Sequence, residues 1–199
     1  MTLKPEIFFT ECLVRPVILF FSLSAILTVG TVHAQTWQVL ETKYLAINYR
    51  NLEDLRQFDR QIKYSEDRKG VFSGFFTSSS EKSASGKKFE RQLAEKLDNL
   101  FEKVQTILDM RKPIKVNVQL YPDQVSLQQA YYAIYGNHRD LMAWYLFEFN
   151  TIYLNVKDLF DGMFAHECAH AIVDNYFDTR PPRATAEILA RYVDTHLKK

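Results

Sequence analysis

The longest regular pattern of hydrophobic residues runs from Phe89 to Leu108. Its apolar positions recur with a period of about 3.6 residues, which predicts an amphipathic helix; they are Phe89, Leu93, Leu97, Leu100, Phe101, Val104, Ile107 and Leu108. Pro113 ends this pattern, and apolar and polar residues then alternate from Ile114 to Leu120. Such alternation predicts a strand with one buried face. A long helix that backs a sheet is therefore the first expected feature of the fold.

Shorter patterns before this helix predict two strands and another helix. Segments 37–40 and 43–49 have the composition of strands, and we expect them to pair. Asn51 precedes apolar residues at helical spacing, which predicts a helix that ends near Tyr64. Residues 65–88 are rich in serine around several phenylalanines. They predict a loop insertion that packs on the domain, and the alternative is a flap or docking loop near a cleft.

The C-terminal half alternates between helical and strand patterns. A helix is expected around residues 127–135, closed by Gly136. Segments 141–147 and 151–156 predict two short strands joined near Asn150. Two further helices are expected at 163–175 and 183–192, with Asp158 or Asp161 as the N-terminal cap of the first and a proline break between them. These patterns together predict an α+β domain with a small mixed sheet.

Length and composition favour one globular domain, because the chain has 199 residues, of which 47% are apolar and 25% charged. The net charge of +1 gives no basis for binding nucleic acid. Residues 1–34 predict a signal peptide, since Lys4 and Arg15 precede the apolar run 17–29 and Ala34 ends a small-residue cleavage site. We therefore expect an exported protein, periplasmic or secreted, whose mature domain 35–199 keeps no stable membrane span. An uncleaved membrane anchor is the alternative.

The candidate chemistry lies in the first of the two C-terminal helices, where His166, Glu167 and His170 form the pattern His-Glu-x-x-His. On a helix the two histidines are one turn apart on one face, so both imidazoles can reach a single metal ion. Glu167 lies on the flank of that face, which suits a general base better than a ligand. The alternative is a core helix whose two histidines are satisfied by hydrogen bonds.

A third ligand is predicted on the following helix, where Glu187 lies among small and apolar residues. Two histidines and a carboxylate from a second helix would leave a coordination position open for water, as catalytic zinc sites do. We expect this stretch to be largely buried, and the alternative is an ordinary surface carboxylate. Should Glu187 not be the ligand, Asp174, Asp178 and Asp194 are the next candidates.

These motifs resemble the gluzincin metallopeptidases, specifically the small peptidase-MA-like (minigluzincin-type) domains. In that family the first motif is followed by a helix with Glu-Gly-x-Ala-x-Tyr, which here reads Glu187-Ile-Leu-Ala-Arg-Tyr192. The resemblance covers most of residues 35–199. It implies a zincin-like metallopeptidase domain with a backing helix and an active-site helix. It also implies that His166, His170 and Glu187 bind zinc and that Glu167 is the general base.

Some features depart from the resembled pattern or stay unassigned. Ile188 replaces the usual glycine and is expected to narrow the space beside the metal. Candidates for a donor to the transition state are Tyr192 and His196, although we expect His196, like His138, to be a surface residue. Asp174, one turn beyond His170, is the expected hydrogen-bond partner of a ligand imidazole.

The function that these observations predict is hydrolysis of peptide bonds in a peptide or protein substrate, with zinc as the cofactor. In the resembled family an edge strand beside the site pairs with an extended peptide, and the second strand of the predicted hairpin leads into the metal helix. Two alternatives are kept. One is a zinc amidase that acts on cell-wall material, and the other is a non-catalytic, zinc-containing envelope protein that binds a partner.

Overall fold

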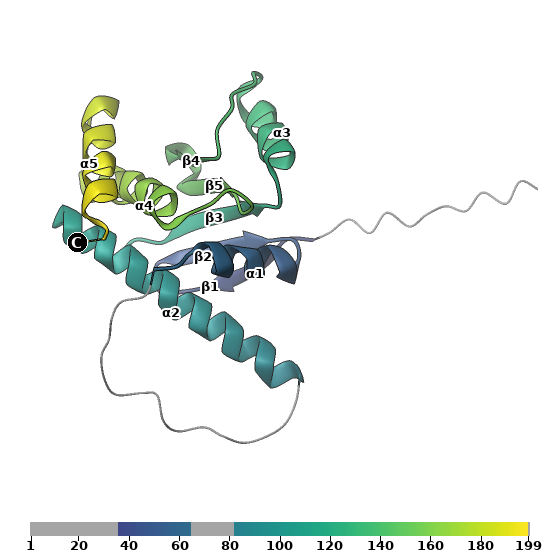
Figure 1. Ribbon diagram of the computed structural model, residues 1–199. Coiled ribbons are helices and arrows are strands. Elements are labelled where there is room, and N and C mark those ends of the chain that lie inside the picture. Colours follow the sequence, from purple (N-terminus) through teal and green to yellow (C-terminus); the bar gives the residue numbers. More distant parts are fainter. Residues whose placement is uncertain (1–35, 65–81, 199) are drawn as a thin grey trace, which may run out of the picture. The chain divides into compact units, whose positions relative to one another are not determined.

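The computed structural model describes residues 36–64 and 82–198, the side chains of residues 82–85 excepted (Figure 1). These residues belong to one compact unit, Gln35–Lys199. The predicted signal peptide and residues 65–81 of the predicted loop insertion lie outside the described residues. Export and signal cleavage therefore stay predictions. Within residues 36–64 and 82–198, no helix combines the length and the apolar character needed to cross a membrane.

The described fold is α+β and contains a five-stranded mixed sheet in the order β1-β2-β3-β5-β4 (Figure 1). Strands β2, β3 and β5 are parallel, while β1 pairs antiparallel with β2 and β4 antiparallel with β5. The order leaves β4 at one edge of the sheet, and this edge is next to the candidate chemistry. The strands are β1 (Gln38–Glu41), β2 (Leu45–Tyr49), β3 (Val116–Tyr121), β4 (Ala143–Leu146) and β5 (Thr151–Asn155).

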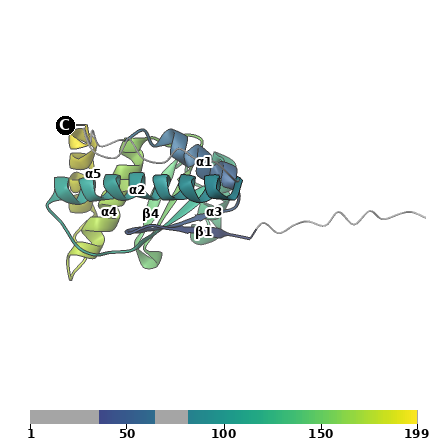
Figure 2. The same ribbon diagram turned by 90° about the horizontal axis from the view of Figure 1, so that it is seen from below.

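Helices pack on both faces of this sheet. Successive residues of a strand point to opposite faces, so their side chains contribute alternately to two apolar clusters. Ile152 and Leu154 of β5 join the larger cluster with the apolar faces of α1, α2, α4 and α5. Tyr153 joins the smaller cluster, beneath α3. Helix α2 runs along the larger layer and contacts both α4 and α5 (Figure 2). The helices are α1 (Leu52–Gln61), α2 (Lys82–Leu108), α3 (Gln124–Tyr135), α4 (Asp161–Tyr176) and α5 (Arg183–His196), with a 3-10 turn η1 (Phe147–Phe149) after β4.

Every helix and strand predicted within the described residues is present. The helix that was predicted to start at Phe89 begins at Lys82. The prediction that residues 82–88 belong to a loop is therefore wrong, because these residues are helical. Helix α1 ends at Gln61, somewhat before the predicted end near Tyr64. Asn51 caps α1 by accepting from the Asp54 N–H, and Gly136 closes α3 in the left-handed conformation (φ 68°), as both residue types favour.

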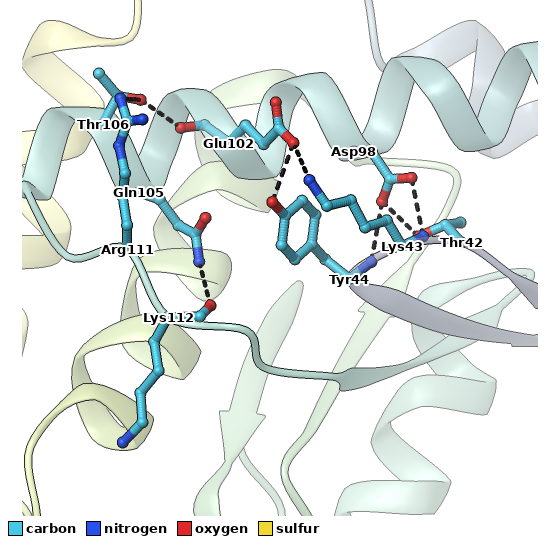
Figure 3. A network of polar contacts seen from close by, with 9 residues as sticks. All are labelled: Thr42, Lys43, Tyr44, Asp98, Glu102, Gln105, Thr106, Arg111 and Lys112. Atoms are coloured by element: carbon cyan, nitrogen blue, oxygen red, sulfur yellow. Dashed lines mark hydrogen bonds and ion pairs between the residues drawn. The ribbon is translucent and has the colours of Figure 1, made fainter.

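Two carboxylates of α2 hold the turn between β1 and β2 (Figure 3). Asp98 accepts hydrogen bonds from the Thr42 hydroxyl at 2.6 Å and from the Lys43 and Tyr44 N–H groups at 2.9 and 3.1 Å. Glu102 accepts from the Lys43 ammonium at 2.8 Å and from the Tyr44 hydroxyl at 3.0 Å. Because α2 satisfies the backbone donors of this turn, these contacts fix the position of the first two strands relative to the helix.

The segment after α2 is tied to the end of α4. The buried Gln105 donates its amide to the Lys112 carbonyl at 2.8 Å (Figure 3). The Lys112 ammonium in turn donates to the Asn175 carbonyl at 2.8 Å and to the Tyr176 carbonyl at 3.4 Å. The last carbonyls of a helix have no partner within the helix and carry partial negative charge, so a lysine there stabilises the end of α4.

Candidate metal centre

Helix α4 carries the candidate motif and is held by its buried face rather than by a side-chain cap. Phe160 occupies the N-cap position and makes no side-chain capping bond. The prediction of Asp158 or Asp161 as the cap is therefore wrong, because both carboxylates are used elsewhere. Asp158 accepts from the Asn155 amide at 2.7 Å, and Asp161 accepts from the Lys63 N–H at 2.6 Å. Residues Phe164, Ala165, Cys168, Ala169 and Ile172 bury the opposite side of α4 in the core.

Three side chains from α4 and α5 converge on one point. Ligand atoms of His166, His170 and Glu187 all lie within 4.8 Å of one another. The two histidine Nε2 atoms are 3.1 Å apart, and the Glu187 oxygens lie 3.9 Å from His166 Nε2 and 3.4 Å from His170 Nε2. This group of two imidazoles and one carboxylate could hold a metal ion.

The packing of α5 against α4 places Glu187, although most of α5 is more exposed than predicted. Only Ala186, Ala190 and Val193 of α5 are buried, while the Glu187 side chain is 38% exposed. Ile188 is 67% exposed and does not line the cleft beside the candidate ligands, so the predicted narrowing by this residue is wrong. The small residues on one side of α5 allow the two helices to approach closely, and this approach brings Glu187 to the histidines.

The second ring nitrogen of His166 has a carboxylate partner. Its Nδ1 lies 3.1 Å from Asp194 Oδ2. A carboxylate only accepts, so Nδ1 of His166 is the donor in this contact, and Nε2 faces His170 and Glu187. Metal-binding histidines are commonly oriented by such a bond. The prediction that Asp174 fills this role is wrong, and Asp194 fills it instead.

Asp174 belongs to a different contact. Its Oδ2 accepts from Arg180 Nε and Nη2, both at 3.0 Å, and the guanidinium also lies 4.5 Å over the ring of Phe147. The Asp174 side chain is only 2% exposed, and its Oδ1 has no hydrogen-bond partner among the described residues. Burial raises the pKa of Asp174, and the hydrogen bond and charge of Arg180 oppose that rise.

Burial keeps the second histidine neutral. Burial, and after it the neighbouring His166, lower the pKa of His170 to about 4, although Glu187 opposes the shift. A neutral imidazole has the free lone pair that a metal requires. Desolvation also raises the pKa of Glu187, but a hydrogen bond from Arg191 and electrostatic interactions with His166, His170 and Arg191 bring it below its ordinary value, so this carboxylate is ionised. The protonation states of these two groups therefore suit metal binding.

Glu167 is buried beside the three candidate ligands and is not part of them. It is 9% exposed, and burial raises its pKa to about 7, against the lowering effects of His166 and of a hydrogen bond from the Tyr145 backbone N–H. A carboxylate with a pKa near neutrality can both accept and return a proton. Glu167 could therefore exchange a proton with a group bound in its vicinity.

A cleft of about 810 Å³ opens over these residues. Its walls are the end of α3, strand β4 with η1, helix α4, and the segment that enters α5. His166, Glu167, His170 and Glu187 all line it, together with the Arg180–Asp174 pair. The four residues predicted from the sequence therefore share one solvent-accessible cavity.

The edge strand β4 turns some of its backbone groups away from the sheet, beside this cleft. The Asn155 N–H donates to the Met142 carbonyl at 3.0 Å, and β4 continues in the same register, with Trp144 opposite Tyr153. Hydrogen-bonded and non-hydrogen-bonded residues alternate along an antiparallel pair, so the backbone groups of Ala143 and Tyr145 point away from β5. Ala143 and Tyr145 both line the cleft.

Comparisons with protein-family models, with curated proteins and with solved structures find no match for this chain. The chemistry of the cleft thus stands on the geometry of its own residues.

The remaining candidates lie apart from the cleft. Tyr192 and His196 stack on each other with ring centroids 3.9 Å apart, and neither lines it. His138 likewise lies outside the cleft lining and stacks on Tyr132 at 4.6 Å, so its placement agrees with the predicted surface position.

Sequence reasoning missed the role of Asp194, although a signal was present. Asp194 lies two helical turns after Glu187, hence on the same side of α5, and a residue there can reach the face of α4 that Glu187 reaches.

Proposed function

We propose that this chain is an exported zinc-dependent metallopeptidase of the gluzincin type with a zincin-like fold. The observation that carries the proposal is the convergence of His166, His170 and Glu187 within 4.8 Å, beside the buried Glu167. A purely structural metal site would need the ligands alone. A buried glutamate with a raised pKa on the flank of the ligand group, open to a cleft, supports a catalytic role.

The donor set fits zinc better than calcium or magnesium. Calcium and magnesium prefer oxygen ligands, whereas zinc is commonly held by two histidines and one carboxylate. A zinc ion bound there would act as a Lewis acid towards a water molecule and the scissile carbonyl. Asp194 holds His166 in the tautomer that leaves Nε2 free for the ion.

The proton transfers belong to Glu167. In the proposed reaction its carboxylate accepts the proton of the attacking water and later delivers it to the leaving amine. The Tyr145 N–H orients one side of this carboxylate, and the edge strand that supplies this N–H also lines the cleft. Strand β4 thus positions the proposed base, Glu167, and also forms the wall of the cleft against which a substrate would lie.

The free edge of β4 supports an extended peptide as the substrate. A peptide that adds to a sheet edge is held by main-chain hydrogen bonds, which do not depend on its sequence. The carbonyl groups of Ala143 and Tyr145 point to that edge. A scissile bond held against β4 would lie along the cleft that contains Glu167 and the candidate ligands.

The experiment that tests this function compares wild type with Glu167→Gln, each loaded with zinc, on a randomised peptide library. Glutamine keeps the size of the side chain but cannot take the proton, so hydrolysis should fall by roughly 10²- to 10⁴-fold. Zinc content, measured by elemental analysis, should be unchanged because Glu167 is not a ligand. Equal cleavage by both proteins would refute the peptidase function, and retention of zinc in Glu187→Ala would refute the ligand assignment.

A further inference from the structure

Arg183 is a cation in the cleft whose position the fold does not explain. It is the first residue of α5, it is exposed, and it lines the cleft. His170 of α4 and Tyr135 of α3 line the same cleft, so the guanidinium shares this cavity with the candidate ligands and the α3 wall. Among the described residues, no hydrogen bond or ion pair engages its guanidinium.

The nearby acids do not pair with Arg183. Glu187, one turn after Arg183 on the same helix, directs its carboxylate to the two histidines and to Arg191 Nε at 3.1 Å. Asp174 is bound by Arg180. Glu148 of η1 also lines the cleft, but among the described residues neither a hydrogen bond nor an ion pair joins it to Arg183. Arg183 is therefore left with an unused fork of donors.

A cation at this position is unfavourable for the helix. The first turn of a helix carries partial positive charge, so acidic residues stabilise it and basic residues do not. Helix α5 has no acidic residue in its first turn, and its N-cap, Pro182, offers no side-chain bond. A residue that opposes the local preference without a compensating contact is more often kept for function than for stability.

From these observations we infer that Arg183 binds a carboxylate of the substrate and makes the cleft selective for acidic peptides. The inference rests on the proposed peptidase function and names its substrate class. A guanidinium matches a carboxylate with two parallel hydrogen bonds, and such charge-assisted pairs are the strong ones. The carboxylate is either an acidic side chain or the C-terminus of a peptide, since both present the same group.

Four versions of one randomised peptide pool distinguish these sources. Each pool carries either Glu or Gln at one fixed position and ends in either a free or an amidated C-terminus. Binding is measured with zinc-loaded Glu167→Gln protein, in which hydrolysis is suppressed, and cleavage is measured with the otherwise wild-type enzyme. The same pools are applied to Arg183→Gln in both backgrounds. Arg56→Gln serves as the matched control, because Arg56 is an exposed arginine of α1 that does not line the cleft.

If the recognised group is a side chain, we expect the Glu pools to bind about 10- to 100-fold more tightly than the Gln pools with the same C-terminus, as a charged hydrogen-bonded pair allows. If it is the C-terminus, the same difference is expected between the free and the amidated pools with the same fixed residue. Arg183→Gln should reduce this ratio to near one, and Arg56→Gln should leave it unchanged. The melting temperature of Arg183→Gln should equal or exceed that of wild type, because the variant removes a cation from the start of α5.

Three results would overturn the inference. The first is an equal preference for carboxylates in wild type and Arg183→Gln, including the case in which no pool binds. The second is a loss of kcat in Arg183→Gln that is the same for all pools, which would place the guanidinium at the reacting carbonyl. The third is a marked fall in melting temperature, which would make Arg183 structural. Absence of cleavage by wild type would instead refute the peptidase function, while the binding measurements still decide the role of Arg183.

Discussion

At the scale of single residues, two carboxylates next to His166 define the candidate site, namely those of Asp194 and Glu167. Asp194 fixes which nitrogen of His166 faces the other candidate ligands, at a distance of 3.1 Å from Nδ1. Glu167 keeps its carboxylate buried next to that imidazole and out of the ligand group. His166 and Glu167 are adjacent in sequence but differ in their contacts. His166 faces α5 and belongs to the candidate ligands, whereas Glu167 faces the edge strand and does not.

Replacement of Asp194 should weaken the metal site without destroying it. In Asp194→Asn the imidazole of His166 loses its charged partner, and we expect zinc affinity to fall by about 10- to 100-fold. Competition with a chromogenic chelator measures the affinity. The control is Asp178→Asn, since Asp178 is exposed and belongs neither to the ligand group nor to the cleft lining. An affinity in Asp194→Asn equal to that of the control would show that His166 is oriented by something else.

At the scale of secondary-structure elements, the sequence predicted the helices and strands that have a periodic apolar pattern. It missed features that depend on contacts between distant residues. The alternation in 114–120 and the helical period of 89–108 predicted β3 and most of α2 correctly. The start of α2 was missed because residues 82–88 are lysines, serines, an alanine and a glycine and carry no apolar stripe. Helix propensity and the packing of the later turns extend the helix beyond its pattern.

The same limit applies to the candidate site. The spacing of His166 and His170 needs only one helix, and so it could be read from the sequence. The choice of Asp194 over Asp174 as the partner of His166 depends on the angle at which α5 meets α4, which no local pattern contains. Asp174 lies one turn after His170, as predicted, but Arg180 from the intervening segment engages it.

The contact between Arg180 and Asp174 joins the segment before α5 to α4, and its removal should destabilise the fold in a pH-dependent way. In Arg180→Ala the buried Asp174 loses its partner, which we expect to cost about 1 to 3 kcal/mol in the free energy of unfolding. Because Arg180 is the group that lowers the pKa of Asp174, this pKa rises further in the variant. Protonation of Asp174 then relieves the defect as the pH falls through the raised pKa.

Urea denaturation of wild type and Arg180→Ala at a series of pH values measures this effect. The difference in stability should shrink towards acidic pH, and Asp174→Asn combined with Arg180→Ala should be less unstable than Arg180→Ala alone at neutral pH. A stability difference that grows as the pH falls would contradict the assigned pair.

At the scale of the whole molecule, the sheet and α2 form a frame on which α4 and α5 are held. Helix α4 is anchored in the larger core and by Lys112 at its end, whereas α5 buries only three residues, Ala186, Ala190 and Val193. Metal binding would add a link between the two helices. The stability of α5 is therefore expected to depend on the metal more than that of the frame.

Zinc should raise the melting temperature, since a ligand that binds only the folded state stabilises it. At a free zinc concentration about 1,000-fold above Kd the gain is about 4 kcal/mol, which corresponds to roughly 10 °C for a domain of this size. Scanning fluorimetry with and without a chelator measures the shift, and hydrogen exchange should show the largest change in residues 183–196. Glu187→Ala should show no zinc-dependent shift, and an equal shift in that variant would remove Glu187 from the site.

The order of the elements along the chain has a consequence for the moment at which the metal is acquired. All five strands and α2 precede His166 in the chain, and the candidate ligands then follow between His166 and Glu187. During synthesis the frame can pack before any ligand has left the ribosome. Metal capture is thus expected late in the maturation of this protein, and a nascent chain that stalls before α5 would carry His166 and His170 without Glu187, the ligand that completes the candidate site.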